Sequence, residues 1–233
     1  MNVIITGAST GIGFSIAESF ARLGYSLILC SRSEIRLYKA VQDLYTRYPD
    51  VRIKSFLTDL STKQGCEAFV TFVKETGWNI DILVNNAGTY VPGSVYNEPE
   101  EQLSLMLNTN LYSAYYITRG LVPEMITNQS GHIFNICSIA SQQAYNNGGS
   151  YSISKFALLG FGKNLREEMK PHGIKVTNVL PGATYSRSWE DADIDKARIM
   201  EANDVAQMIV AASQLSVQAC VEEIVLRPQL GDL

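Results

Sequence analysis

The sequence predicts an α/β protein, because strand-like and helix-like stretches alternate along its length. Residues 2–6 and 26–30 are short apolar runs, and each leads into a longer stretch with the apolar spacing of a helix. This alternation continues into the C-terminal region and is typical of a parallel sheet covered by helices. The 233 residues fit one large domain or two small ones, but no Pro- or Ser-rich linker divides them, so we predict a single domain over residues 1–233.

The composition is that of an ordinary folded protein and argues against several functions. Hydrophobic residues make up 46% of the chain and charged residues 18%, and the net charge is −4 with a pI near 5.3. A general nucleic-acid binder needs a basic surface, so we expect no nucleic-acid partner. No apolar run reaches membrane-spanning length and no signal-peptide pattern precedes the first strand, so we expect a cytoplasmic protein without a membrane partner. The four cysteines and two histidines are scattered, which predicts no disulfide framework and no metal site.

A glycine-rich loop, residues 7–13, joins the first predicted strand to an amphipathic helix predicted at 14–23. Glycines let the backbone turn sharply and approach a ligand closely, and the free amides at the start of the helix attract a pyrophosphate. An ordinary turn is the alternative, and the spacing Gly-x-x-x-Gly-x-Gly differs from the commoner Gly-x-Gly-x-x-Gly. We expect a nucleotide cofactor to contact Gly7, Ser9, Thr10, Gly11, Ile12 and Gly13.

Arg32 follows the second strand, about 20 residues beyond the glycines, where an acidic residue would bind the ribose hydroxyls of NAD. Its planar guanidinium suits the 2′-phosphate of NADP instead. The alternative is a solvated arginine at the start of a loop, and Glu34 lies close by in the sequence. We therefore predict NADP(H) as the cofactor in preference to NAD(H), and a helix at 34–47.

The third strand, predicted at 51–57, ends next to Asp59 and Leu60. A carboxylate here either accepts a hydrogen bond from the adenine amino group of the cofactor or supports the start of the next helix, for which Ser61 is a natural N-cap. Both interpretations fit the local sequence. We include Asp59 and Leu60 among the expected cofactor-binding residues, and the helix is predicted to end near residue 76.

Two consecutive asparagines, Asn85 and Asn86, follow the fourth predicted strand at 80–84. Their side chains can tie neighbouring loops together, while the small Ala87 and Gly88 leave room for a flat cofactor at the carboxyl ends of the strands. A plain turn is the competing interpretation. We expect Asn86, Ala87 and Gly88 to contact the cofactor.

A long helix is predicted at 99–125, and a polar trio, residues 108–110, interrupts its apolar pattern. Asn110 either points into the core and holds a water molecule or faces solvent. The fifth strand follows at 131–137, and Ser138 stands just past its carboxyl end, where ligands bind in a parallel sheet. Ser138 is therefore a candidate to orient a substrate oxygen.

Tyr151 and Lys155 lie four residues apart at the start of a helix predicted to end at residue 170, so their side chains share one face. An ammonium group nearby favours the phenolate and lowers the pKa of a tyrosine, which makes Tyr151 a candidate proton donor and acceptor. The spacing alone occurs by chance on many exposed helices. The position of the pair in the chain strengthens the prediction of a catalytic role, because Ser138 and Tyr151 are expected to meet across one crevice.

The last part of the chain is predicted to form a strand, a helix and a seventh strand, at 174–180, 203–215 and 220–226. The residues just past the sixth strand would face the nicotinamide end of a bound cofactor, because ligands bind at the carboxyl ends of parallel strands. We expect cofactor contacts there from Pro181, Gly182 and Thr184.

The segment 183–202 is predicted to be a substrate lid, with Tyr185 and Trp189 lining the pocket. Aromatic side chains followed by an acidic cluster suggest a segment that covers a site. A solvated helix and loop is the alternative interpretation.

Taken together, the glycine loop, the Asn-Asn-Ala-Gly run, the Tyr-x-x-x-Lys pair and the Pro-Gly pair at 181–182 resemble the short-chain dehydrogenase/reductase family over nearly the whole chain. The resemblance implies a Rossmann-like, doubly wound parallel sheet of seven strands with helices on both faces. It also implies a catalytic tetrad formed by Asn110, Ser138, Tyr151 and Lys155.

By this resemblance the protein uses NADPH to reduce a ketone or other carbonyl group of a small molecule. Tyr151 would protonate the carbonyl oxygen, and Ser138 would polarise the carbonyl. Lys155 would bind the nicotinamide ribose and lower the pKa of Tyr151, and Asn110 would hold a relay water.

Shorter stretches near 185–189 and 221–228 look most like bacterial sepiapterin-reductase-like members, which suggests a pterin side chain or a diketone as substrate. Reduction of 3-oxoacyl groups on acyl carrier protein is the alternative, although the acidic residues at 190–195 would repel that acidic partner. A third interpretation is a non-catalytic NADP(H)-sensing or scaffold protein. The resemblance further implies a homodimer or homotetramer packed through the helices at 99–125 and 150–170.

Overall fold

The computed structural model describes residues 1–185 and 195–232, and it contains one parallel sheet of seven strands. The strands are β1 (Asn2–Thr6), β2 (Ser26–Ser31), β3 (Ile53–Leu57), β4 (Ile82–Asn85), β5 (Gly131–Ile136), β6 (Ile174–Pro181) and β7 (Glu223–Leu226). Their order in the sheet is β3-β2-β1-β4-β5-β6-β7, and every neighbouring pair is parallel. The order reverses between β1 and β4, which confirms the predicted doubly wound sheet.

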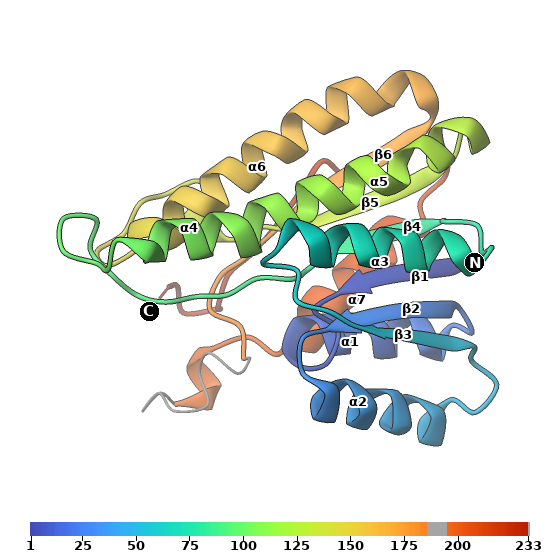
Figure 1. Ribbon diagram of the computed structural model, residues 1–233. Helices are drawn as coiled ribbons and strands as arrows, with labels where there is room; N and C mark the ends of the chain where they lie inside the picture. The colour runs from blue at the N-terminus through green and yellow to red at the C-terminus, as the bar shows by residue number, and fades with distance from the viewer. Residues whose placement is uncertain (186–194, 233) are drawn as a thin grey trace.

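Helices cover both faces of this sheet. The α-helices are α1 (Gly11–Arg22), α2 (Glu34–Arg47), α3 (Lys63–Glu75), α4 (Glu101–Leu107), α5 (Ser113–Asn128), α6 (Gly149–Met169) and α7 (Ala202–Ser213). Figure 1 shows α1, α2 and α7 on one face and α3, α5 and α6 on the other, as right-handed crossovers between parallel strands require. In the part of the chain that the structure describes, none of these helices has the length and apolar character needed to cross a membrane.

Each face of the sheet is buried in an apolar core. In β1, Val3 and Ile5 belong to the core with α1 and α7, and Ile4 belongs to the core with α3 and α5. Successive side chains of a strand point to opposite faces, so one strand contributes to both cores. Phe20 of α1 and Phe69 of α3 are both fully buried, and a buried side chain of this size stabilises a fold by about 2–3 kcal/mol. This packing on both faces holds the carboxyl ends of the strands in fixed positions along one edge of the sheet.

The helix predicted at 99–125 is divided into two helices. A π-helical turn, η1 (Asn108–Tyr112), separates α4 from α5. The wider turn brings Asn110 into the interior, where it is 1% exposed. The polar trio therefore marks a real interruption, and π-turns of this kind are frequent at functional sites.

Several predicted boundaries differ from the observed ones by a few residues, and three of these differences have a clear structural reason. α1 begins at Gly11 rather than at residue 14, so two glycines of the loop lie in its first turn. Thr62, not Ser61, is the N-cap of α3, because its hydroxyl accepts a hydrogen bond from the Gly65 amide at 3.0 Å. β7 begins at Glu223 rather than at residue 220, since its pairing with β6 starts there.

Several titratable side chains are buried in the two cores. Cys30, Cys66 and Cys137 are buried, and desolvation raises the pKa of each thiol, so these thiols stay protonated. His132 lies in β5 with its Nε2 2.8 Å from the Thr177 hydroxyl, and burial lowers its pKa to about 3. The surroundings of these four side chains are therefore those of structural core residues.

Candidate active site

The glycine loop and the 85–88 loop lie side by side where the strand order reverses, at the carboxyl ends of β1 and β4. Asn86 joins them, because its Nδ2 donates to the carbonyl oxygens of Thr6 and Gly7 at 2.8 and 3.0 Å. The Thr6 hydroxyl accepts in turn from the backbone amides of Asn86 and Ala87, both at 2.9 Å. The predicted tie between loops is confirmed for Asn86, whereas Asn85 points inward and donates to side chains of β5 and α5.

Backbone geometry explains the glycines of the loop. Gly7 and Gly11 adopt φ angles of 64° and 56°, a region that favours glycine. A Cβ on Gly13 would lie 2.4 Å from the Gly7 oxygen and 2.3 Å from Asn86 Nδ2, so only glycine lets α1 approach the loop this closely. Among the described residues, the N-cap Thr10 makes no side-chain bond to the first amides of α1, and these amides remain available to an anion.

Arg32 lies at the edge of the glycine loop. The hydroxyls of Ser9 and Ser31 are 2.8 Å apart, which places the neighbouring Arg32 beside the loop, where its side chain is exposed. Arg36, in the first turn of α2, donates from Nε to the Ser33 hydroxyl at 3.1 Å. Sequence reasoning missed this second guanidinium, although its spacing of four residues from Arg32 was a usable signal.

Asp59, Leu60 and Ile12 are predicted cofactor contacts whose surroundings are largely structural. Asp59 accepts a hydrogen bond from the Ser61 amide at 2.9 Å, which supports the turn before α3. Leu60 is buried in the core with α3, and Ile12 packs against the core on the other face. Asp59 is exposed, and cofactor contacts from these three residues stay a prediction.

Ser138 and Tyr151 come together beyond the carboxyl end of β5, as predicted. Ser138 precedes the 3-10 turn η2 (Ile139–Ser141), and its Oγ accepts from the Ala140 amide at 3.1 Å. Tyr151 lies in the first turn of α6, and its phenol is near enough to the Ser138 side chain for that hydroxyl to act against the rise in the pKa of Tyr151. The two hydroxyls are thus adjacent and come from elements that pack against each other.

Lys155 is 5% exposed, and its Nζ donates to the Ile136 carbonyl oxygen at 2.8 Å. Burial lowers the pKa of Lys155 to about 8. Burial raises the pKa of Tyr151 to about 12, although the neighbouring Ser138 hydroxyl acts in the opposite direction. The Lys155 ammonium lies 5.8 Å from the centroid of the Tyr151 ring, and burial has the largest influence on the pKa of Tyr151 here, so an effect of Lys155 on that pKa stays a prediction.

Asn110 points inward from η1, which confirms one of its two predicted orientations. Its Oδ1 accepts from the Thr89 amide at 2.7 Å, and its Nδ2 donates to the Thr89 oxygen and the Ser154 hydroxyl at 3.0 and 2.9 Å. A Cβ on Gly88 would lie 3.3 Å from Asn110 Oδ1 and 3.7 Å from Lys155 Nζ. The 85–88 loop therefore touches the tetrad residues, while the relay water stays a prediction.

The residues after β6 form a tight turn against the C-terminal region. The Gly182 amide donates to the Leu226 oxygen at 2.7 Å, directly after Pro181. Thr184 is buried, and its hydroxyl donates to the Gly182 oxygen at 2.9 Å. Tyr185 follows and is exposed. Trp189 and half of the predicted lid lie outside the described residues.

Two tyrosines that sequence reasoning missed surround Tyr151. The Tyr90 ring packs edge-on against the Tyr151 ring, with centroids 4.9 Å apart and an interplanar angle of 82°. Tyr145 lies nearby, and burial raises the pKa of its phenol, with the Tyr90 and Tyr151 side chains acting in the same direction. Tyr90 lies two residues after Gly88 and Tyr145 six before Tyr151, so proximity to motifs was the available signal.

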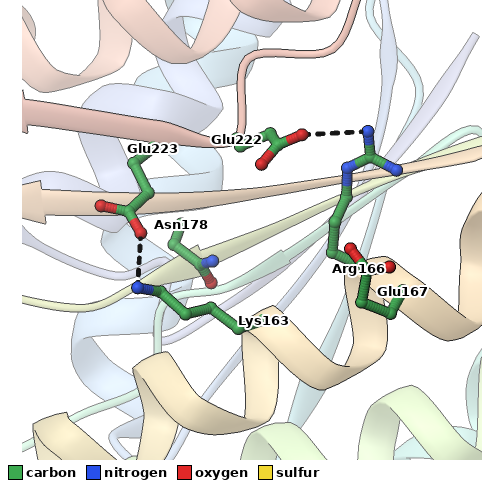
Figure 2. Close-up of a pocket in the computed structure, with 6 residues that line it drawn as sticks. All are labelled: Lys163, Arg166, Glu167, Asn178, Glu222 and Glu223. Atoms are coloured by element: carbon green, nitrogen blue, oxygen red, sulfur yellow. Dashed lines mark hydrogen bonds and ion pairs between the residues drawn. The ribbon is translucent and has the colours of Figure 1, made fainter.

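A pocket of about 280 Å³ lies elsewhere, between α6 and the start of β7 (Figure 2). Its charged side chains are paired: Lys163 Nζ is 3.0 Å from Glu223 Oε1, and Arg166 is 3.2 Å from Glu222 Oε1. Lys163 is two helical turns, or about 12 Å, along α6 from Lys155. The reactive hydroxyls thus lie outside this pocket.

The model of the short chain dehydrogenase family matches residues 1–197. Together with the fold and the gathered tetrad residues, this match shows that the chain belongs to the short-chain dehydrogenase family of oxidoreductases.

The chain is 34% identical to sepiapterin reductase of Chlorobaculum tepidum, over 99% of this chain and 97% of that protein. A solved metagenomic short-chain oxidoreductase in complex with NADP is 28% identical, with a TM-score of 0.85 over 98% of this chain and 97% of that one. L-sorbose reductase from Gluconobacter frateurii, complexed with NADPH and L-sorbose, is 27% identical, with a TM-score of 0.88 over 97% and 94% of the two chains.

Proposed function

We propose that this protein is an NADPH-dependent carbonyl reductase that acts on a small molecule. The observation that supports it most directly is that the side chains of Ser138 and Tyr151 lie next to each other, beside the buried Lys155. A carbonyl oxygen placed at these hydroxyls would meet two hydrogen-bond donors at once. Two donors that converge on one oxygen stabilise the negative charge that develops there during reduction.

The residues present fit NADP(H). The free amides at the start of α1 suit the pyrophosphate, and the guanidinium groups of Arg32 and Arg36 suit a 2′-phosphate. The solved relatives that contain NADP or NADPH support the same choice. We assign the remaining contacts to the predicted residues near the tetrad and past β6, which are Asn86, Ala87, Gly88, Pro181, Gly182 and Thr184.

The bound cofactor supplies the hydride, and the side chains of this chain manage the oxygen and its proton. Ser138 donates to the substrate oxygen and orients the carbonyl. Tyr151 transfers its proton to that oxygen, and its raised pKa keeps the phenol protonated and ready to donate at neutral pH. Lys155 would hold the nicotinamide ribose and stabilise the phenolate that forms. Asn110 fixes the Thr89 backbone beside the site, and we assign to it the predicted relay water.

The tyrosines around the site indicate the substrate class. Tyr90 and Tyr145 present partly exposed rings next to Tyr151, and Tyr185 is exposed beyond β6. Flat aromatic surfaces stack well on a planar heterocycle or a conjugated diketone. The likeness to a sepiapterin reductase supports a ketone on a pterin side chain. We propose this class ahead of 3-oxoacyl groups on acyl carrier protein.

We also propose that residues 1–233 work as one domain and assemble as a homodimer or homotetramer in the cytoplasm. Exposed apolar side chains on α4, η1 and α6 support an interface on that face: Leu105, Tyr112, Ile153 and Phe156. Burying such side chains between subunits removes apolar surface from water. Light scattering that finds a monomer at micromolar concentration would contradict the assembly.

A panel of carbonyl compounds with NADPH and NADH tests the proposed activity. The panel contains sepiapterin, butane-2,3-dione and acetoacetyl-CoA, and cofactor absorbance reports turnover. We expect NADPH consumption with the pterin or the diketone and slower reaction with NADH. Turnover of acetoacetyl-CoA alone would favour the acyl-carrier-protein activity, and tight NADPH binding without any turnover would favour a non-catalytic sensor.

A further inference from the structure

Glu98, in the loop between β4 and α4, binds the first turn of α6 directly before Tyr151. Its Oε2 accepts from the Ser150 amide at 3.2 Å and from Gln102 Nε2 at 3.1 Å. Its Oε1 accepts from the Ser150 hydroxyl, and Ser150 is fully buried. The N-cap of α6 is Gly148, which has no side chain to satisfy the first amides of the helix. A carboxylate from a distant segment takes that place and also complements the helix dipole.

Further contacts fix this loop against the residues that precede α6. The Gly93 amide donates to the Asn147 oxygen at 3.1 Å, and the Ser94 hydroxyl donates to Asn147 Oδ1 at 2.7 Å. The Glu98 amide donates to the Ser94 oxygen at 2.8 Å. A Cβ on Gly149 would lie 2.3 Å from the Gly93 oxygen, so the two backbones are in direct contact.

The other end of the same loop lies at the tetrad. Both backbone groups of Thr89 are hydrogen-bonded to Asn110, and the Tyr90 ring packs edge-on against Tyr151. The loop therefore contacts the catalytic region at its start through Thr89 and Tyr90 and the start of α6 at its end through Glu98. A change at either end can move the phenol of Tyr151 relative to Ser138.

We propose that Glu98 is a positioning residue for Tyr151. Its bonds to Ser150 hold the first turn of α6 in place, and this keeps the Tyr151 phenol at the distance from the Ser138 hydroxyl that proton transfer to the substrate needs. This inference rests on the proposed role of Tyr151 as proton donor. Glu98 acts through the helix start and not on the substrate. A displacement of about 1 Å in such a group lowers turnover by about 100-fold.

Steady-state kinetics of Glu98 variants, with NADPH and the best carbonyl probe of the panel, test the proposal. We expect Glu98→Ala to lower kcat about 10- to 100-fold while the Kd for NADPH changes by less than about 2-fold. Glu98→Gln keeps the shape and can satisfy Ser150 and Gln102, so it restores kcat to within about 3-fold of the unmodified protein. Glu100→Ala is the matched control, because among the described residues Glu100 makes no side-chain hydrogen bond and is exposed.

Ser150→Ala removes only the hydroxyl bond to Glu98 and gives a second, milder variant if Glu98→Ala folds poorly. The double variant that combines Glu98→Ala with Ser150→Ala should have a kcat no lower than that of Glu98→Ala alone, because both changes remove the same interaction. Amide hydrogen exchange of residues 145–155 should rise in Glu98→Ala and stay unchanged in Glu100→Ala, whether or not any probe is reduced.

An unchanged kcat in Glu98→Ala, an equal loss in Glu98→Gln, or unchanged exchange at the start of α6 would each overturn the positioning role. If Tyr151→Phe is inactive while Glu98→Ala is unimpaired, only this inference fails. If Tyr151→Phe keeps full turnover, the proposed function fails instead.

Discussion

Replacing Lys155 with methionine should make the protein more stable near neutral pH and abolish its activity. The unmodified protein keeps a charged group that is 5% exposed and whose pKa burial lowers from 10.5 to about 8. Each pKa unit corresponds to about 1.4 kcal/mol, so burying the protonated amine costs on the order of 3 kcal/mol below pH 8. Methionine has a similar length and no charge. Loss of the bond to Ile136 costs about 1–2 kcal/mol, which leaves a net gain of about 1–2 kcal/mol.

The pH dependence distinguishes this explanation from a simple packing effect. Between pH 8 and 10.5 the unfolded chain holds a proton on Lys155 that the folded chain has lost, so folding becomes more favourable as pH rises. The variant lacks this dependence, and its advantage should disappear across that window. Other groups that titrate there, including the buried cysteines, are present in both proteins and cancel in the difference.

Urea unfolding of both proteins at intervals from pH 7 to pH 10 measures this difference. A constant difference in free energy of unfolding across the window would refute the assignment of a charged, desolvated amine to Lys155. Lower stability of Lys155→Met at pH 7 would refute the estimate of its burial cost. If Lys155→Met kept its turnover, the amine would not be needed for the chemistry.

Three further predictions concern the cofactor site and the core. Arg32→Ala should weaken NADPH binding about 10-fold or more and NADH binding by less than about 2-fold, and equal losses in fluorescence titrations would contradict a contact with the 2′-phosphate. Gly13→Ala should weaken the binding of both cofactors, because its Cβ would lie 2.4 Å from the Gly7 oxygen; unchanged binding would contradict the close packing of α1. Burial lowers the pKa of His132 from 6.5 to about 3, so the folded protein should lose on the order of 4–5 kcal/mol of stability as the pH falls through this range. His132→Gln should remove this loss. Identical acid unfolding curves for the variant and the unmodified protein would contradict the prediction.

The strands and the motifs at their carboxyl ends could be predicted because their signals are local. A β-branched run followed by glycines or by two asparagines specifies a strand end, and a parallel sheet then gathers such ends at one edge. Ser138 and Tyr151 could be placed together for this reason. The proximity of these two residues follows from the topology of the sheet and does not depend on the details of packing.

The pKa of Tyr151 and the contacts of Glu98 depend on distant parts of the chain. A Tyr-x-x-x-Lys spacing says nothing of how deeply the pair is buried, and burial is the largest cause of the raised pKa of Tyr151. Glu98 and Ser150 are 52 residues apart, so no local pattern joins them. The same holds for the row of buried amides across the sheet, in which Asn85 donates to Asn135 and Asn135 donates to Asn178, at 3.0 and 3.2 Å.

The π-helical turn at Asn110 could be predicted in part from the local sequence and depends in part on distant segments. Its polar trio signalled an interruption in the sequence, but the wider turn itself depends on packing between α4, α5 and α6. The inward amide is stabilised by Thr89 and Ser154, which come from two other segments. A local signal therefore located the irregularity, and the tertiary structure determined its form.

The most direct test of the proposed chemistry is the turnover of Tyr151→Phe with NADPH and the carbonyl panel, beside the unmodified protein. The change removes only the phenol hydroxyl beside Ser138 and leaves the ring that packs against Tyr90. We predict a fall in kcat of about 100- to 10,000-fold with the Kd for NADPH unchanged within about 2-fold. Full activity of Tyr151→Phe on any carbonyl that the unmodified protein reduces would contradict Tyr151 as the proton donor.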